Sequence, residues 1–138
     1  MTDQLKSRRA FLTTPAAAGA AFSIIRPELV RGWAPAKLKI GLVGCGGRGT
    51  QAVEDAMNGD PAVELTAMGD AFEDKLEGSL RGLKNKPSMA KHADRVKVDP
   101  DKRFVGFDAF EKVLKTDVDV VFLATPPGWR PIHFEAVI

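Results

Sequence analysis

The sequence has few of the residues that build cross-linked or membrane-spanning proteins. Among its 138 residues there is one cysteine, so no intrachain disulfide can form, a cysteine-based zinc site is excluded, and no metal site is expected. No apolar run reaches the roughly 18 residues of a membrane-spanning helix, so no stable membrane span is expected. There is no large excess of one charge either, because 20 basic and 18 acidic side chains give a net charge of +2. This balance argues against a nucleic-acid-binding protein.

Residues 1–36 are predicted to be an export signal rather than part of the fold. The arginine pair at positions 8 and 9 precedes a mildly apolar, alanine-rich stretch over 11–25, and a small-x-small site lies at 34–36. These are the three parts of a secretory signal. The arginine pair before Phe-Leu resembles a twin-arginine signal. We therefore expect export by the twin-arginine route to the periplasm or an equivalent extracytoplasmic compartment. The alternative, an amphipathic surface helix, is disfavoured by a proline near each end.

The positive charge of the chain belongs to this leader. Its 36 residues hold five of the 20 basic side chains and two of the 18 acidic ones. The other residues therefore carry 15 basic and 16 acidic side chains, a net charge of −1. A hydrophobic fraction of 44% and a charged fraction of 28% are typical of a globular domain.

Residues 37–138 alternate between strand-like and helix-like patterns. Branched apolar runs occur at 37–43, 63–69, 104–107 and 118–125, and each is followed by a helical spacing or a helix start. Such alternation predicts a parallel sheet with right-handed crossovers. The expected fold class is α/β, a Rossmann-type doubly wound parallel sheet that is incomplete, because four strands are seen where about six are usual. We therefore expect a truncated piece of a longer protein.

Local sequence patterns within this domain lead to further predictions. The last strand run is nearly all apolar, which suits a strand covered on both faces. Asp108 and Glu111 have the spacing of a capping box. One apolar face of the second helix is expected from Phe72, Leu76, Leu80 and Leu83. Residues 84–103 have no clear periodicity. The stretch 81–103 holds eight basic against three acidic residues, so we expect a solvated insertion there. It has no aromatic residue, which excludes a stacking platform for single-stranded nucleic acid.

A glycine-rich segment carries the main functional signal. Residues 44–49, Gly-Cys-Gly-Gly-Arg-Gly, match G-x-G-x-x-G. The segment directly follows a predicted strand and opens a predicted helix, and Asp70 lies at the end of the next strand, 21 residues after Gly49. Together these features predict dinucleotide binding. A structural glycine turn in another α/β fold is the alternative.

Each glycine of this loop has an expected role. Gly44 would allow the tight turn out of the strand, and Gly49 would let the helix pack close to the sheet. At Gly46 the absent side chain would let a pyrophosphate approach the backbone, and Gly47 extends this small-residue surface. The phosphates would then lie on free N–H groups at the positive end of the helix.

Two charged residues bear on the choice of dinucleotide. Asp70 would accept hydrogen bonds from the adenosine ribose hydroxyls, and its charge would repel a 2′-phosphate. We therefore expect NAD, with NADP as the alternative. Arg48 is a candidate for contact with the pyrophosphate or with a 2′-phosphate, or it is simply a solvated first-turn arginine.

Other candidate residues lie near the ends of strands. Thr125 and Pro126 follow the fourth strand, at a carboxyl end, and are expected to line the nicotinamide side of the site, unless they form a plain strand-to-helix turn. For His133 we expect packing or capping, with substrate contact as the alternative. His92 is expected to be a surface residue. Cys45 is expected to be a small loop residue without reactivity, because no histidine lies near it in the sequence to act as a base.

Three segments resemble the Gfo/Idh/MocA oxidoreductases, the family of glucose-fructose oxidoreductase and inositol 2-dehydrogenase. They are residues 38–49, residues 104–114 and residues 118–136, and the resemblance covers essentially all of 37–138. It implies an N-terminal Rossmann domain followed by a C-terminal α/β domain. It also implies a catalytic lysine in a Glu-Lys-Pro motif beyond Ile138, so no catalytic residue is assigned. The leader followed by Gly-Gly-Arg-Gly is similar to exported bacterial members.

The expected function follows from this resemblance. We expect the NAD(P)-binding domain of an exported oxidoreductase that acts on a sugar, cyclitol or related polyol by hydride transfer, and a homo-oligomer for the full-length protein. One alternative is an NAD-dependent glycosidase that oxidises its sugar transiently and returns the hydride. Another is a Rossmann domain kept as a binding module without catalysis. A Glu-Lys-Pro segment beyond the sequence would favour the enzymes.

Overall fold

The computed structural model of this chain describes residues 37–138, so the leader expected over 1–36 lies outside the described residues. Strands and helices alternate as predicted. The strands are β1 (Leu38–Val43), β2 (Val63–Asp70), β3 (Arg103–Val105) and β4 (Val120–Leu123). The α-helices are α1 (Gly47–Gly59), α2 (Glu73–Asn85), α3 (Ala109–Leu114) and α4 (Arg130–Val137), and two 3₁₀ helices are η3 (Pro87–Arg95) and η4 (Pro100–Lys102).

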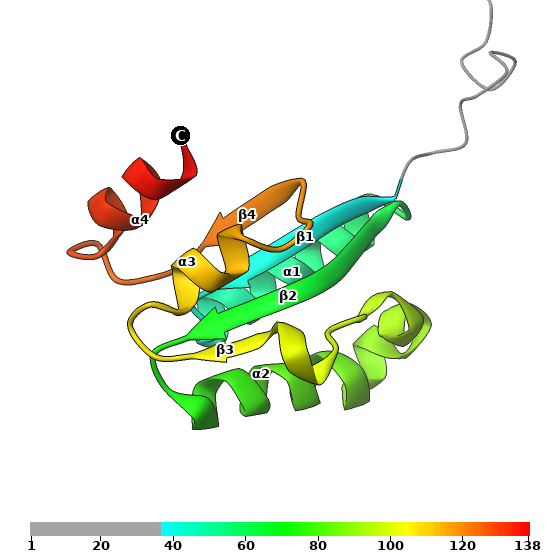
Figure 1. Ribbon diagram of the computed structural model, residues 1–138. Coiled ribbons are helices and arrows are strands. Elements are labelled where there is room, and N and C mark those ends of the chain that lie inside the picture. The colour runs from blue at the N-terminus through cyan, green and yellow to red at the C-terminus, as the bar shows by residue number, and fades with distance from the viewer. Residues whose placement is uncertain (1–36) are drawn as a thin grey trace, which may run out of the picture. The chain divides into compact units, whose positions relative to one another are not determined.

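The four strands form one parallel sheet in the order β3-β2-β1-β4 (Figure 1). Strand β1 pairs with β2 on one side and with β4 on the other. The chain therefore moves outward from β1 to β3 and then crosses back to the other side of β1. This reversal is the topological switch point of a doubly wound sheet, where ligands of this architecture bind. The predicted α/β fold class is confirmed.

Helices cover both faces of the sheet. In Figure 1, α1 lies behind the strands and α3 lies in front of them, and α2 runs below β3 and packs beside α1. The larger apolar cluster joins β1 and β2 to α1, α2 and the segment around η3, with Leu42, Leu65 and Leu83 fully buried. A smaller cluster on the other face contains Val43, Ala67 and Val113 of α3. Successive side chains of a strand point to opposite faces, so β1 contributes to both clusters.

The expectation of a solvated insertion at 81–103 is wrong. Met89 is fully buried, and the following apolar residues Val96 and Val98 join the larger cluster. His92, which we expected at the surface, is only 7% exposed, and its Nε2 lies 2.9 Å from Asn58 Oδ1. These side chains are buried because the segment forms a 3₁₀ helix. Side chains three apart align on one face of a 3₁₀ helix, so Met89, His92 and Arg95 all point inward from η3.

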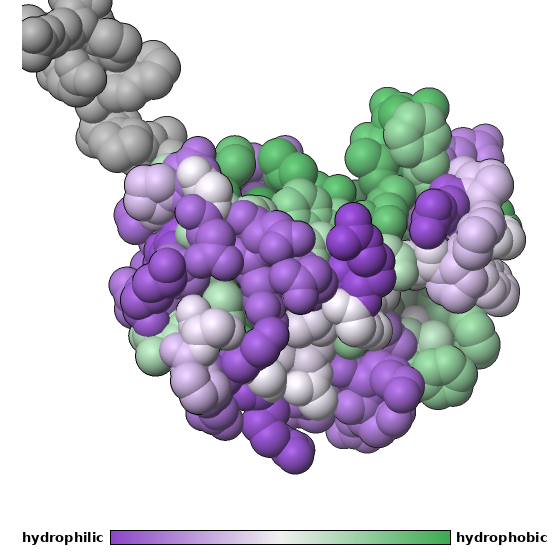
Figure 2. Space-filling view, turned by 180° about the vertical axis from the view of Figure 1, so that it is seen from behind, coloured by the Kyte–Doolittle hydropathy of each residue, from purple (hydrophilic) through white to green (hydrophobic). Residues whose placement is uncertain are grey.

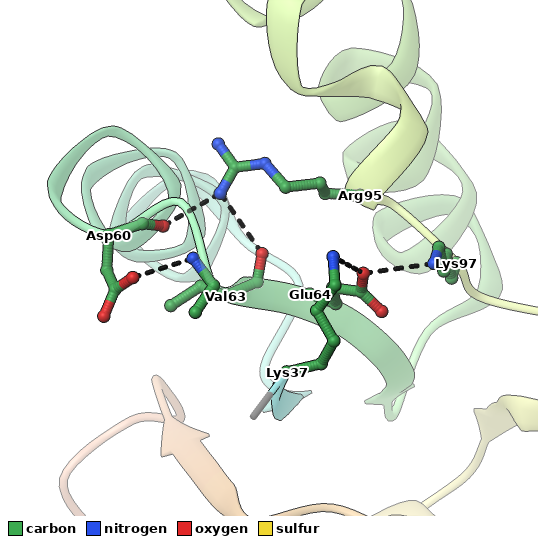
Figure 3. A network of polar contacts seen from close by, with 7 residues as sticks. Lys37, Asp60, Val63, Glu64, Arg95 and Lys97 are labelled. Atoms are coloured by element: carbon green, nitrogen blue, oxygen red, sulfur yellow. Dashed lines mark hydrogen bonds and ion pairs between the residues drawn. The ribbon is translucent and has the colours of Figure 1, made fainter. Parts of the chain in front are cut away.

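Arg95 ties η3 to the last turn of α1 at the amino end of the sheet. One of its terminal nitrogens donates to the carbonyl oxygens of Asp60 at 2.8 Å and Val63 at 3.3 Å (Figure 3). The other donates to the Met57 carbonyl at 2.7 Å. Its second nitrogen also contacts His92 Nδ1. The last carbonyls of a helix have no partners within it, so Arg95 caps this end of α1.

A buried carboxylate lies beside this cap. Glu64 of β2 is 5% exposed and accepts hydrogen bonds from Lys37 Nζ at 2.6 Å and Lys97 Nζ at 3.1 Å (Figure 3). The hydrogen bond from Lys37 is the main cause that lowers the pKa of Glu64. The amino end of the sheet is therefore closed by polar contacts.

Two expectations at helix starts are wrong. Phe72 is not on the apolar face of α2, because it lies at the N-cap position with 61% of its surface exposed. The other three residues of that predicted face are buried. Asp108 occupies the N-cap position of α3, as the capping-box spacing predicts, but its side chain makes no capping hydrogen bond and instead pairs with Lys112 Nζ at 2.8 Å, one turn along the helix. Asp108 therefore forms an ion pair rather than a capping box.

The last two strands are shorter than predicted. Strand β3 ends at Val105 because Gly106 has φ +123°, and Phe107 beyond it is 69% exposed. Strand β4 begins only at Val120, because the Asp119 carboxylate accepts the Lys39 N–H at 2.8 Å. It is an edge strand of the described sheet and half-buried, not covered on both faces as expected.

Candidate functional site

The glycine loop between β1 and α1 requires glycine at two positions. Gly44 has φ +94°, in the left-handed region, and a Cβ there would lie 2.8 Å from the Ala124 backbone carbon. A Cβ on Gly49 would lie 2.0 Å from the Gly44 carbonyl oxygen, closer than any real contact. These contacts agree with the expected tight turn at Gly44 and the close helix packing at Gly49.

The outer part of the loop is open. A Cβ on Gly46 or Gly47 would meet nothing within 4 Å, and Arg48 in the same turn is exposed. Gly46 is the N-cap of α1, and no described side chain caps this end by a hydrogen bond. The N–H groups in the first turn of a helix have no partners within it and carry partial positive charge. This end of α1 therefore has the properties of an anion-binding site.

Asp70 connects the end of β2 to the glycine loop. Its Oδ2 accepts the Cys45 N–H at 2.5 Å, and its Oδ1 accepts the Phe72 N–H at 3.0 Å. An ionised carboxylate has about four lone-pair sites, so about two are left for further donors. The half-buried side chain is thus fixed in position and retains capacity for ligand hydroxyls.

Cys45 is held in the loop as an unreactive thiol. It is 3% exposed, and its Sγ lies 3.5 Å from the Gly69 carbonyl oxygen. Burial, and secondarily the negative charge of Asp70, raises the pKa of the Cys45 thiol to about 12. The thiol is therefore protonated at neutral pH and is not a nucleophile. This agrees with the expectation from the sequence.

A pocket of about 440 Å³ lies at the carboxyl ends of the strands. Its volume falls within the roughly 300–1,000 Å³ of small-molecule sites. It brings together five of the eight predicted site residues, namely Gly44, Gly46, Asp70, Thr125 and Pro126. Its other lining residues are Val43, Gly69, Ala71, Phe72, Lys75, Gly106, Phe107, Ala109, Phe110, Ala124, Trp129 and His133.

The other three predicted site residues lie outside this lining. Gly47 faces a shallower groove between α1 and α2, which shares Gly46 and Lys75 with the pocket. Gly49 is buried beneath the loop, and Arg48 points to neither cavity. The groove continues the pocket around the amino end of α1, where a ligand phosphate would lie.

Thr125 and His133 form the polar part of the pocket on the β4 side. Thr125 Oγ1 lies 3.0 Å from His133 Nδ1, and the Arg130 side chain donates to the Thr125 carbonyl at 2.9 Å. His133 is 7% exposed and packs against Phe110, with ring centroids 4.4 Å apart. Burial lowers the pKa of His133, so its ring is neutral at pH 7. The packing role expected for His133 is confirmed, and the ring also lines the pocket.

The sequence analysis missed the aromatic side chains of this site. Phe72, Phe107 and Trp129 follow β2, β3 and β4 and are 61%, 69% and 46% exposed. The rings of Phe107 and Trp129 stack at a centroid distance of 5.6 Å. In Figure 2, hydrophobic surface gathers on the right of the view, whereas much of the left is hydrophilic. The signal was present, because each aromatic residue lies within a few positions of a strand's carboxyl end.

In comparisons with known proteins, no family model matches this chain, and no curated protein matches it significantly. Within residues 37–138, no helix combines the length and the apolar character that crossing a membrane requires.

Proposed function

We propose that residues 37–138 are the NAD-binding domain of an exported oxidoreductase, related to the Gfo/Idh/MocA family, that acts on a sugar, cyclitol or related polyol by hydride transfer. One observation carries the proposal. The Asp70 carboxylate accepts the Cys45 N–H of the glycine loop at 2.5 Å, at the edge of a pocket at the switch point of the sheet. A ribose-binding acid and a phosphate-binding loop are thereby held side by side.

The residues present fit a dinucleotide that runs across the carboxyl ends of the strands, with its adenosine at β2 and its nicotinamide at β4. The adenosine ribose would donate its hydroxyls to the free lone pairs of Asp70. The pyrophosphate would lie against Gly46 and Gly47, where no side chain fills the space, at the positive end of α1. Thr125 and Pro126 would then lie beside the nicotinamide.

NAD fits this arrangement better than NADP. Asp70 is an acceptor with no proton to donate when ionised, and a 2′-phosphate placed beside it would bring two negative charges together. Arg48 is exposed in the first turn of α1 and lines neither cavity, so it stays a candidate for contact with the pyrophosphate or with a 2′-phosphate.

The described residues bind and orient the ligand in this proposal. The nicotinamide ring, when bound, supplies the hydride acceptor or donor. His133 is neutral and hydrogen-bonded to Thr125, so its role is to hold that side chain at the pocket wall. No residue of 37–138 is assigned as the catalytic acid or base.

The test is a titration of the full chain with NADH and NADPH, followed by the emission of the bound reduced nicotinamide. We expect saturable binding of NADH and weaker binding of NADPH, with ADP-ribose displacing both. The protein purified from the exported compartment should also be tested for bound nucleotide by native mass spectrometry. A Kd above about 1 mM for both dinucleotides would reject the proposal, because a Kd of 1 mM corresponds to a binding free energy of only about 4 kcal/mol.

A further inference from the structure

The pocket and the groove meet at one basic side chain. Gly46, the N-cap of α1, and Lys75, in the first turn of α2, are the two described residues that line both cavities. Among the described residues that line the pocket, Lys75 is the one lysine or arginine, and Asp70 is the one acid. Lys75 therefore borders the same space as the glycine loop and Asp70, but from the neighbouring helix.

The ammonium group of Lys75 is held only weakly by the protein. Its Nζ lies 3.8 Å from Asp74 Oδ2, which is longer than a hydrogen bond, and the two side chains are 60% and 76% exposed. An exposed ion pair of this kind contributes little. The other two charged side chains that line the groove neutralise each other, because Lys86 Nζ donates to both carboxylate oxygens of Glu54 at 2.8 Å. The charge of Lys75 is thus free to pair with a ligand.

The position of Lys75 does not favour the stability of α2. The first turn of a helix carries partial positive charge, so acidic side chains are favoured there and basic ones are disfavoured. Glu73 and Asp74 follow this rule, whereas Lys75 does not. Because the Lys75 side chain is also 60% exposed, it adds little to the core. A contribution to folding therefore does not explain a cation at this position.

We propose that Lys75 pairs with a phosphate group of the dinucleotide at the junction of the pocket and the groove. This inference rests on the proposed function. A dinucleotide brings the two negative charges of its pyrophosphate near the charge of Asp70, and the amino end of α1 supplies only partial positive charge. The ammonium of a lysine that borders the same cavity offsets this repulsion with a full charge.

The phosphate group that we expect Lys75 to contact is the pyrophosphate. Gly46, against which the pyrophosphate would lie, borders both cavities together with Lys75, whereas Asp70 borders only the pocket. NADP also carries a 2′-phosphate, on the ribose that Asp70 would hold. Three small ligands separate these two sources of the same chemistry. ADP has phosphates only on the 5′ side, 2′-AMP has only the 2′-phosphate, and adenosine has neither.

The experiment is a fluorescence titration of the full chain with NADH and with NADPH, in which adenosine, ADP and 2′-AMP compete for the site. Lys75→Gln removes the charge, and Lys75→Arg keeps it. Lys84→Gln is the matched control, because Lys84 is an exposed lysine in the last turn of the same helix and lines neither cavity. Each titration is run at about 50 mM and about 500 mM salt. Urea unfolding measures the stability of each variant.

We expect Lys75→Gln to raise the Kd values of NADH, NADPH and ADP by about three- to tenfold at low salt. This loss should shrink at high salt, because screening already weakens the ion pair of the wild type. The Kd of adenosine and the urea midpoint should not change. Lys75→Arg and Lys84→Gln should bind every ligand nearly as the wild type does. A loss confined to NADPH and 2′-AMP would still support a phosphate contact of Lys75, but with the 2′-phosphate.

Two results would overturn this inference and leave the proposed function intact. One is a loss in Lys75→Gln that is no larger than in Lys84→Gln for any phosphate-bearing ligand. The other is an equal loss for adenosine and ADP, since Lys75 would then only shape the pocket. A wild-type chain that binds neither NADH nor NADPH would reject the proposed function, and the role of Lys75 with it.

Discussion

The two ends of α1 show opposite solutions to the same chemical problem. At its carboxyl end, the last carbonyl groups are satisfied by the buried Arg95 side chain, which donates to Met57 and Asp60 at 2.7 and 2.8 Å. At its amino end, the N-cap is Gly46, no described side chain caps the helix, and a pocket and a groove adjoin it. Every helix leaves unpaired groups at both ends, so the difference lies in what is placed beside them.

This difference separates stability from function within one helix. At the closed end the side chains of Arg95, His92 and Glu64 are buried and tie neighbouring elements together by hydrogen bonds. The open end is lined by glycines and by exposed aromatic residues, which do little for the core. Substitutions at the closed end should therefore change the free energy of unfolding, and those at the open end should change ligand binding.

The largest effect is expected from removing the cap at the closed end. Arg95→Met keeps the length of the side chain but removes the donor from three carbonyl groups, of which those of Val63 and Met57 are buried. We expect the free energy of unfolding to fall by about 2–4 kcal/mol. Urea unfolding followed by circular dichroism measures it. The control is Arg81→Met on the exposed surface of α2, expected within about 0.5 kcal/mol of the wild type. Equal losses in the two variants would contradict the capping role.

A smaller effect on stability, with a large effect on binding, is expected at the open end. A Cβ in Gly49→Ala would lie 2.0 Å from the Gly44 carbonyl oxygen, so the first turn of α1 must shift. We expect a loss of about 1–3 kcal/mol in the free energy of unfolding. NADH affinity should fall by more than about tenfold as the N–H groups move. In the control Gly82→Ala on α2 the new Cβ meets nothing, so the free energy of unfolding should rise by about 0.5–1 kcal/mol and NADH binding should match the wild type. Unchanged NADH binding in Gly49→Ala would separate the loop from the ligand.

The third prediction concerns the choice between the two dinucleotides. Asp70→Asn removes the charge that disfavours a 2′-phosphate and weakens the hydrogen bonds to ribose. We expect NADH affinity to fall by about tenfold, while NADPH affinity falls less or rises. The Kd for NADPH divided by the Kd for NADH should therefore decrease. The control is Asp101→Asn, an exposed carboxylate in η4 that lines neither cavity. A fall of both affinities by one factor would show that Asp70 only shapes the loop.

The open end was largely predictable from the sequence, and the closed end was not. The glycine loop and Asp70 follow from spacing, because the local backbone of a strand-turn-helix unit fixes where they lie. Five of the eight predicted residues line one pocket for this reason. The expected roles of Gly44 and Gly49 also agree with the close contacts around them.

The errors arise where the local pattern differs from an ordinary helix or where a side chain has two possible partners. Met89, His92 and Arg95 recur every three residues, a period that a search for α-helical spacing of 3.6 does not detect. Asp108 has the right spacing for a capping box but pairs with Lys112 instead. The stacking of Phe107 on Trp129 joins loops from opposite edges of the sheet, which no local pattern encodes.

The smallest expected effect is the pH dependence of the closed end. His92 Nδ1 contacts the Arg95 guanidinium, which can only donate, so the ring must be neutral, with Nε2 donating to Asn58 Oδ1. Burial, followed by the positive charges of Arg95 and Lys91, lowers the pKa of His92, and the nearby Asp94 only partly offsets them. The unfolded chain therefore binds a proton more readily than the folded one. This contribution to stability is fully present above the unfolded pKa of about 6.5 and is lost as the pH falls below it.

We therefore expect the urea midpoint of the wild type to fall between about pH 7.5 and pH 5.5. His92→Gln can still accept from Arg95 and donate to Asn58, but it does not titrate, so the dependence should flatten. The chain has only two histidines, and burial lowers the pKa of His133 as well. His92→Gln and His133→Gln should therefore each remove part of the pH dependence, and the double variant should remove most of it. If His133→Gln removed all of it, the histidine at the open end, not the one beside Arg95, would be the titrating group.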